Sequence, residues 1–110
     1  MNLEETARIY FSAFENKDLE TLSEMFQESV SLKDWNIYAE GKESVVEANA
    51  NIFESTGEIT VTVSNLYVCD LTVVAELMIF VDGGNALPVV DIIKFNSAEK
   101  IESIVAYRGN

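Results

Sequence analysis

The sequence predicts an α+β domain in which three helices from the first half of the chain pack on a curved β-sheet. Two observations support this prediction. Apolar residues recur at helical spacing in three segments before residue 56, whereas residues 58–108 alternate at strand spacing and are interrupted only by short polar turns. A mixed or antiparallel sheet that curls over helices on its concave face forms a cone with an apolar interior. A small-molecule pocket is expected at the mouth of such a cone.

The helices are predicted from apolar stripes and from residues that start helices. Residues 2–15 carry the first stripe, and Asp18 can cap a second helix after a break in the pattern. The third helix starts either directly after Gly41 or at a capping box that begins at Ser44, and it ends near residue 55. Its inner stripe includes one polar residue, Asn49, whose amide group needs a partner.

The strands are predicted from runs of β-branched residues that alternate with polar ones. A short strand is expected at residues 30–35, and residues 37–39 either pair with it or form a turn. Pro88 lacks a backbone donor, so it requires an edge strand, a bulge or the first residues of its strand. The four long strands are expected at about 58–69, 72–82, 86–96 and 100–108.

The charge balance and the residue types exclude several classes of function. Seven basic residues against nineteen acidic ones give a formal net charge of −12. Such a surface repels phosphate backbones and anionic membranes, so no nucleic-acid or membrane partner is expected. With no histidine and one cysteine, the usual zinc, haem and iron–sulfur ligand sets and histidine-based triads are absent. Neither a metal nor another cofactor is therefore expected.

The length and the start of the chain give further expectations. At 110 residues, a single domain over residues 1–110 is expected. The first residues lack the basic and apolar regions of a signal peptide, and no apolar run reaches membrane-spanning length, so a cytoplasmic location is expected. Cys69 lies in a strand-like run and has no second cysteine to pair with. It is expected to be a small buried side chain in a reducing compartment.

Asp91 is the most informative single residue, because it is a carboxylate inside an apolar strand. Alternation puts it on one face with Leu87, Val89, Ile93 and Phe95. A carboxyl group among hydrocarbons must be paired, hydrogen-bonded or protonated. On this pattern, Asp91 is either a site residue or a structural carboxylate that bonds a helix or faces water at a dimer seam.

The opposite face of the sheet is also apolar, and Val74, Val90 and Ile92 are candidates for it. The helices can cover only one face of the sheet. A second molecule is therefore expected on the other, which predicts a homodimer through this sheet face.

Two stretches of the chain resemble a known family, the nuclear transport factor 2-like superfamily and within it the SnoaL-like and ketosteroid isomerase branch. In the first stretch, Tyr10, Lys17-Asp18, Met25-Phe26 and residues 30–34 fall at the family's spacing. In the second, Ala86-Leu87, Val90-Asp91, Lys94-Phe95, Ile101 and Ala106-Tyr107 do so. The resemblance implies a cystatin-like cone. It also implies cofactor-free proton transfer next to a carbonyl group, by an isomerase or a polyketide cyclase-like enzyme, in an apolar pocket.

The same resemblance implies roles for individual residues. It makes Asp34 similar to the general base, Tyr10 to the phenol that stabilises the oxyanion, and Asp91 to the protonated acid that shares this oxyanion. An enolisation needs such a base at the α-carbon and donors at the oxygen where charge develops. The residues expected to contact the ligand are Trp35, Asn49, Phe26, Ile104 and Arg108.

The chain also departs from the isomerase pattern. Phe26 and Asn49 stand where supporting tyrosines are expected, and Trp35 stands where proline is common. Arg108 replaces a pocket aromatic; it either contacts an anionic ligand or pairs with a surface acid. A turn glycine is replaced near Glu99, at a modest cost in stability if that residue adopts a positive φ. The alternative to an enzyme is a module of the same fold that binds a small ligand or dimerises without chemistry.

Two rival chemistries of this fold conflict with the residue types. The epoxide hydrolases need an arginine between two acids in the pocket, and Arg8 and Arg108 are the only arginines in the chain. Neither is expected at that position. The dehydratases need histidine, which the chain lacks, so this class is excluded.

Overall fold

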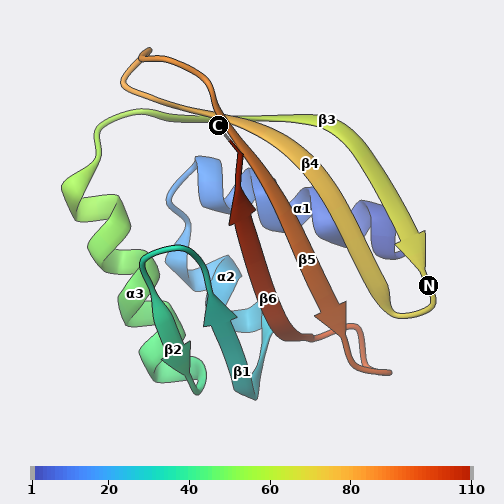
Figure 1. Cartoon of the computed structure of the whole chain (residues 1–110). Helices are drawn as coiled ribbons and strands as arrows, with labels where there is room; N and C mark the ends of the chain where they lie inside the picture. Colours follow the sequence, from blue (N-terminus) through green and yellow to red (C-terminus); the bar gives the residue numbers. More distant parts are fainter. Residues whose placement is uncertain (1, 110) are drawn as a thin grey trace.

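The computed structural model describes residues 2–109 and builds them from three helices and six strands (Figure 1). The helices are α1 (Leu3–Glu15), α2 (Leu19–Met25) and α3 (Lys42–Ser55). The strands are β1 (Phe26–Lys33), β2 (Tyr38–Glu40), β3 (Ile59–Cys69), β4 (Thr72–Val81), β5 (Leu87–Phe95) and β6 (Ile101–Arg108).

The strands form one mixed sheet in the order β2-β1-β6-β5-β4-β3. Only β1 and β6 pair in parallel; the other neighbours are antiparallel. The sheet is open and curved, and all three helices lie on one side of it (Figure 1). α1 packs against β3 and β4, and α3 packs against β1 and β2. The predicted α+β plan with helices on the concave face of a curved sheet is therefore confirmed.

Local hydrogen bonds explain where the helices begin and end. The side chains of Asn2 and Asp18 accept the backbone N–H groups of Glu5 and Thr21 and so cap α1 and α2. α3 starts directly after Gly41, which has a φ of 90° and provides no side-chain cap. This finding decides between the two predicted starts, because a positive φ favours glycine.

A lysine connects the turn between the first two helices to the end of the third. Lys17 has a φ of 57°, which reverses the chain between α1 and α2. Its Nζ donates to the carbonyl oxygens of Phe53 and Thr56, at 2.9 and 2.6 Å. These carbonyls lie at the C-terminus of α3, where a positive charge is favourable. The helical layer is thereby fixed as one unit over the sheet.

The structure corrects two expectations. β1 begins at Phe26, four residues before the predicted start. Of the two alternatives left open for residues 37–39, the structure has the pairing, since β2 pairs with β1. Cys69 is exposed, so the prediction that it is buried was wrong. It is the last residue of the edge strand β3 and lies opposite Thr72, on the face that no helix covers. Glu99 has a φ of 62°, so the condition under which replacing the turn glycine carries a modest cost is met.

The two faces of the sheet differ in how well they are covered. On the concave face of β5, the side chains of Val89, Asp91, Ile93 and Phe95 are all buried. On the convex face, which no helix of residues 2–109 covers, Tyr67 and Tyr107 are 56% and 60% exposed. Because the helices enclose the concave side, functional groups are best sought there.

Among the helices of residues 2–109, none is both long and apolar enough to cross a bilayer.

Candidate functional site

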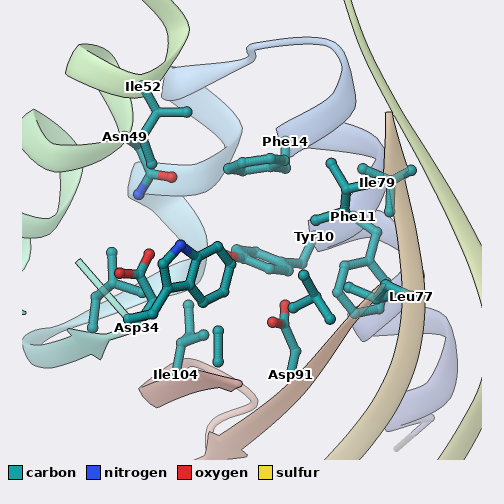
Figure 2. A pocket seen from close by; sticks show the side chains of 15 residues that line it. Tyr10, Phe11, Phe14, Asp34, Asn49, Ile52, Leu77, Ile79, Asp91 and Ile104 are labelled. Carbon is teal, nitrogen blue, oxygen red and sulfur yellow. The ribbon is translucent and has the colours of Figure 1, made fainter. Parts of the chain in front are cut away.

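A cavity of about 80 Å³ lies between the concave face of the sheet and the helices (Figure 2). Most of its wall is aliphatic or phenylalanine. The side chains that bring polar groups to it are those of Tyr10, Asp34, Trp35, Asn49 and Asp91. These residues come from α1, the loop after β1, α3 and β5, so the fold assembles distant parts of the sequence around one space.

Tyr10 brings a phenol into the cavity from the apolar stripe of α1. Its ring packs edge-on against Phe11 and tilted against Phe26, at centroid distances of 5.5 and 6.5 Å. These contacts hold the ring. Burial, together with the negative charge of Asp91, raises the pKa of the Tyr10 phenol above its usual range. The hydroxyl is therefore a neutral hydrogen-bond donor at physiological pH.

Asp91 lies in the middle of β5 and is 8% exposed. Its strand neighbours on either side are Ala75 and Ala106, and the short side chains of these alanines leave room for the cavity. Within residues 2–109, no donor is hydrogen-bonded to its carboxyl group. Burial first, and the charge of Asp34 second, raise the pKa of Asp91 from 3.8 to about 7. Near neutral pH a large fraction of this carboxyl group is protonated and can donate a hydrogen bond.

Asp34 faces the same cavity from a different environment. It directly follows β1, and its Oδ1 accepts the N–H groups of Asn36 and Ile37, each at 2.7 Å. Its own N–H donates to the carbonyl of Ile37 at 2.9 Å. The residue is half-buried, and no partner on the described chain bonds its second oxygen. Asp34 is thus both a turn former and a carboxylate with one oxygen free for a ligand.

Asn49 and Trp35 complete the polar part of the wall. Asn49 is 2% exposed, and its Nδ2 donates to the carbonyl of Val45 one turn earlier, at 2.9 Å. That bond leaves its amide oxygen as an acceptor toward the cavity. Trp35 is 40% exposed. The Asn36 amide, oriented so that donors meet acceptors, accepts from Trp35 Nε1 at 3.3 Å, which holds the indole at the mouth.

The predicted site residues do not all meet in the cavity. Tyr10, Asp34 and Asp91 come together, as Figure 2 shows, and Trp35, Asn49 and Ile104 line the same space. Phe26 and Arg108 do not line it. Phe26 is 1% exposed and lies behind the ring of Tyr10. Arg108 is exposed at the end of β6, opposite Val89 and beyond the last lining residue of that strand.

Several wall residues were not singled out from the sequence. Phe11 and Phe14 of α1, Ile52 of α3 and Leu77 and Ile79 of β4 all line the cavity. The helical stripe and strand alternation mark them as inward-facing. Nothing in these patterns separates a residue that lines a hollow from one that fills the core.

No arginine lines the cavity within the described residues. Arg8 lies on the surface of α1, where it pairs with Glu4 at 3.4 Å, and Arg108 lies outside the cavity wall. The arrangement of an arginine between two acids is therefore not present there. Within residues 2–109 there is also no group of three or more cysteine, aspartate or glutamate side chains placed to hold a metal ion.

Comparison with known proteins assigns the fold to a family. A model of the SnoaL-like domain matches residues 7–104. No curated protein matches the chain significantly in sequence.

Three solved structures illustrate the similarity in fold. The first is assigned to the SnoaL-like polyketide cyclases of Shewanella denitrificans (TM-score 0.88, 17% identity, 97% of this chain and 90% of that one). The second is SalBIII, an epoxide hydrolase/cyclase-like enzyme of pyran ring formation in salinomycin (TM-score 0.84, 19% identity, 97% of this chain and 90% of that one). The third has a ketosteroid isomerase-like fold, comes from Catenulispora acidiphila and holds trimethylamine (TM-score 0.78, 18% identity, 89% of this chain and 80% of that one).

Proposed function

The chain belongs to the SnoaL-like family, and we propose that it is a cofactor-free enzyme that moves a proton on the carbon next to a carbonyl group. One observation supports this above the others: two carboxyl groups in one apolar cavity have contrasting environments. Asp91 is buried without a partner, whereas Asp34 is half-exposed and accepts two backbone N–H groups. Such a contrast is typical of an acid and base pair.

In the proposed reaction, the free oxygen of Asp34 removes the α-proton of the substrate. The electron pair of the broken C–H bond forms a C=C bond, and the π electron pair of the carbonyl group moves to its oxygen. The product is an enolate whose negative charge lies largely on that oxygen. The Tyr10 hydroxyl and the protonated Asp91 carboxyl group donate hydrogen bonds to that oxygen. Asp34 returns the proton to the same or a neighbouring carbon in an isomerase. In a cyclase, the enolate carbon attacks a second carbonyl group of the same molecule, the π electron pair of that group moves to its oxygen, and the proton held by Asp34 passes to the resulting alkoxide.

Deuterium exchange tests this proposal without a known substrate. The wild-type protein in D2O should speed the replacement of the α-protons of cyclopentanone, measured by proton NMR against buffer. Asp34→Asn keeps an acceptor for both N–H groups but removes the base, so exchange should slow by about 10²–10⁴-fold. Asp70→Asn is the matched control, because Asp70 lies in the β3–β4 turn with a φ of 53°, which asparagine tolerates. Equal exchange by Asp34→Asn and the control would contradict the proposal.

A second candidate function is the binding of a small organic ammonium ion without chemistry. Two carboxyl groups and the rings of Tyr10, Phe11, Phe14 and Trp35 line the cavity, and no lysine or arginine of residues 2–109 does. Aromatic rings and carboxylates attract such cations. The similar structure from Catenulispora acidiphila is a complex with trimethylamine, which supports this alternative.

Binding of tetramethylammonium at several pH values separates the two candidates. Asp91 loses its proton around pH 7, so a cation should bind more tightly as the pH rises above 7. Exchange of α-protons should instead weaken over the same range, because Asp91 can no longer donate. Calorimetric titration that detects tetramethylammonium binding, in a protein without exchange activity, would favour the binding module.

We further propose that the protein forms a homodimer through the convex face of the sheet. Cross-strand pairing aligns Tyr67, Val74, Ile92 and Val105 in one apolar row on that face. Glu76 lies beside this row, and the net charge of −12 on each chain opposes the association of two chains. Sedimentation equilibrium should show a dimer for the wild type and a monomer for Ile92→Asp. A wild-type monomer at micromolar concentration contradicts this proposal.

A further inference from the structure

A second hollow, of about 220 Å³, adjoins the cavity described above. The two hollows share five lining side chains, those of Phe14, Asp34, Trp35, Ile52 and Ile79. They are therefore neighbours with a common wall. The first, which holds Tyr10, Asn49 and Asp91, is called the inner chamber below, and the second is called the outer chamber.

Most of the wall of the outer chamber is apolar: of its eleven lining residues six are aliphatic, two are aromatic, and Asp34, Asn36 and Thr56 are polar. Its own lining comes from the loop after β1, the end of α3, the start of β3, the end of β4 and the start of β5. Ile37, Ile59, Val81 and Leu87 supply apolar surface. The hydroxyl group of Thr56 already donates to the carbonyl of Ile52, at 2.8 Å. The Asn36 amide bonds Trp35, so among the described lining residues the second oxygen of Asp34 is the free polar group, and the rest of the chamber suits an apolar ligand.

The sizes of the chambers limit what each can hold. Ligand pockets usually measure about 300–1,000 Å³, and the inner chamber, at about 80 Å³, is far smaller. It has room for a small head group next to Tyr10 and Asp91. A larger ligand that reaches these groups has to extend elsewhere, and the outer chamber is the adjoining space. Among the described residues, neither lining includes a lysine or arginine, so an anionic end group is disfavoured in both chambers.

We propose that the outer chamber is a binding site for a neutral apolar tail, and that the ligand joins this tail to a small carbonyl head in the inner chamber. The role of the head rests on the proposed function, whereas the site for the tail does not. Asp34 lines both chambers. The carbon at which the proton is removed is therefore the one that connects the head to the tail.

Binding of straight-chain methyl ketones, from 2-butanone to 2-nonanone, tests the proposal. Trp35 is the only tryptophan and lines both chambers, so its emission reports occupancy. Each added methylene should lower Kd by up to about fourfold until the chamber is full, because about 0.8 kcal/mol is gained for each buried CH2. Kd values that do not fall with chain length would overturn the proposal.

Two substitutions on the same strand provide a matched comparison. Val81 lines the outer chamber and Met78 lies on the opposite face of β4, and each is 38% exposed. Val81→Gln should flatten the dependence of Kd on chain length, and Met78→Gln should leave it as in the wild type. Leu87→Gln, on the neighbouring strand, should act like Val81→Gln and replaces it if that variant does not fold. Equal slopes in all the variants would contradict the assignment.

The outcome for the tail can be separated from that for the proposed chemistry. Asp34→Asn should keep the dependence of Kd on chain length while it loses deuterium exchange. If the wild type shows that dependence but no exchange, the tail site stands and the proposed enzyme does not. If it exchanges α-protons but binds all the ketones equally, the chemistry stands and the tail site is wrong.

Discussion

The floor of the inner chamber and its rim each carry an aspartate, but the one on the floor is buried and the one on the rim is partly exposed to solvent. The floor consists of Tyr10 and Asp91, which lie on a helix and a central strand and have no hydrogen-bond partner on the described chain. The rim is the loop of residues 34–37, where Asp34 accepts two backbone N–H groups and remains half-exposed. The carboxyl group on the floor has a raised pKa of about 7.

This difference shows how backbone position alone can assign roles to two aspartates. A central strand under a helical layer excludes water, so its carboxyl group is favoured in the neutral form. A loop at the mouth offers N–H donors and solvent, which suit a carboxylate. The charged carboxyl group of Asp91 should therefore lower the free energy of unfolding, whereas the hydrogen bonds of Asp34 should raise it. Substitutions can test both statements.

The largest expected effect is on the floor and concerns stability. In the unfolded chain Asp91 ionises around its ordinary pKa of 3.8, and in the folded protein around 7. Stability should therefore fall as the pH rises from 4 to 7 and stay low above that, because the folded state must then bury a charge. Asp91→Asn should be more stable than the wild type at pH 8, by up to about 4 kcal/mol.

Urea denaturation at pH 8 and at pH 4 measures this effect. The advantage of Asp91→Asn should shrink toward zero at pH 4, where the carboxyl group is protonated in the folded state and about 40% protonated in the unfolded chain. Asp70→Asn, at an exposed turn, is the control for an unrelated loss of charge. An advantage of equal size at both pH values would show that burial of a charge is not its cause.

The second prediction separates chemistry from stability on the same floor. Tyr10→Phe removes the hydroxyl group but keeps the ring contacts with Phe11 and Phe26. Since that hydroxyl bonds no group of residues 2–109, the free energy of unfolding should change little. Deuterium exchange should slow by about 10²–10³-fold, as for the loss of one oxyanion donor. Unchanged exchange would exclude Tyr10 from the proposed reaction.

The sequence predicts the floor better than the rim. Asp91 is marked by strand alternation and Tyr10 lies on a helical stripe, because burial on a regular element has a fixed period. The helical stripe predicts only the burial of Tyr10, and its role, like that of Asp34, was assigned through a family resemblance, since an aspartate after a strand is most often only a turn former. Its two N–H bonds show that it is a turn former in this chain too.

Contacts between distant segments could not be predicted in this way. The parallel pairing of β1 with β6 changes register between Phe26 and Ser31, which puts Phe26 opposite Ile101 and behind Tyr10. Such a shift depends on the packing of the whole sheet and leaves no local pattern. The outer chamber likewise forms where a loop and the ends of three strands meet. The apolar neighbours of Cys69 in the sequence predicted that it is buried. It is exposed because its side chain lies on the convex face of the sheet, which no helix of residues 2–109 covers.

The third prediction concerns the pH dependence of the proposed reaction. Donation by Asp91 needs its proton, so exchange should fall by up to about tenfold per pH unit above pH 7. The side-chain amide that Asp91→Asn introduces donates at every pH, so the decline should disappear in that variant even if its rate is lower. Rates measured between pH 6 and pH 9 for both proteins check this. The same decline in both would assign it to a group other than Asp91.

The smallest expected effect is on the rim, and it has the opposite sign to that on the floor. Asp34→Ala removes the acceptor of two N–H groups, one of which is exposed and can bond water instead, so the protein should lose about 1 kcal/mol. Asp34→Asn should lose less, because its Oδ1 can still accept both. Urea denaturation at pH 8 then compares Asp34→Ala with Asp91→Asn directly. If Asp34→Ala also stabilises the protein, repulsion between the two charges outweighs the hydrogen bonds of the turn. The carboxylate on the rim then costs stability, as the one on the floor does.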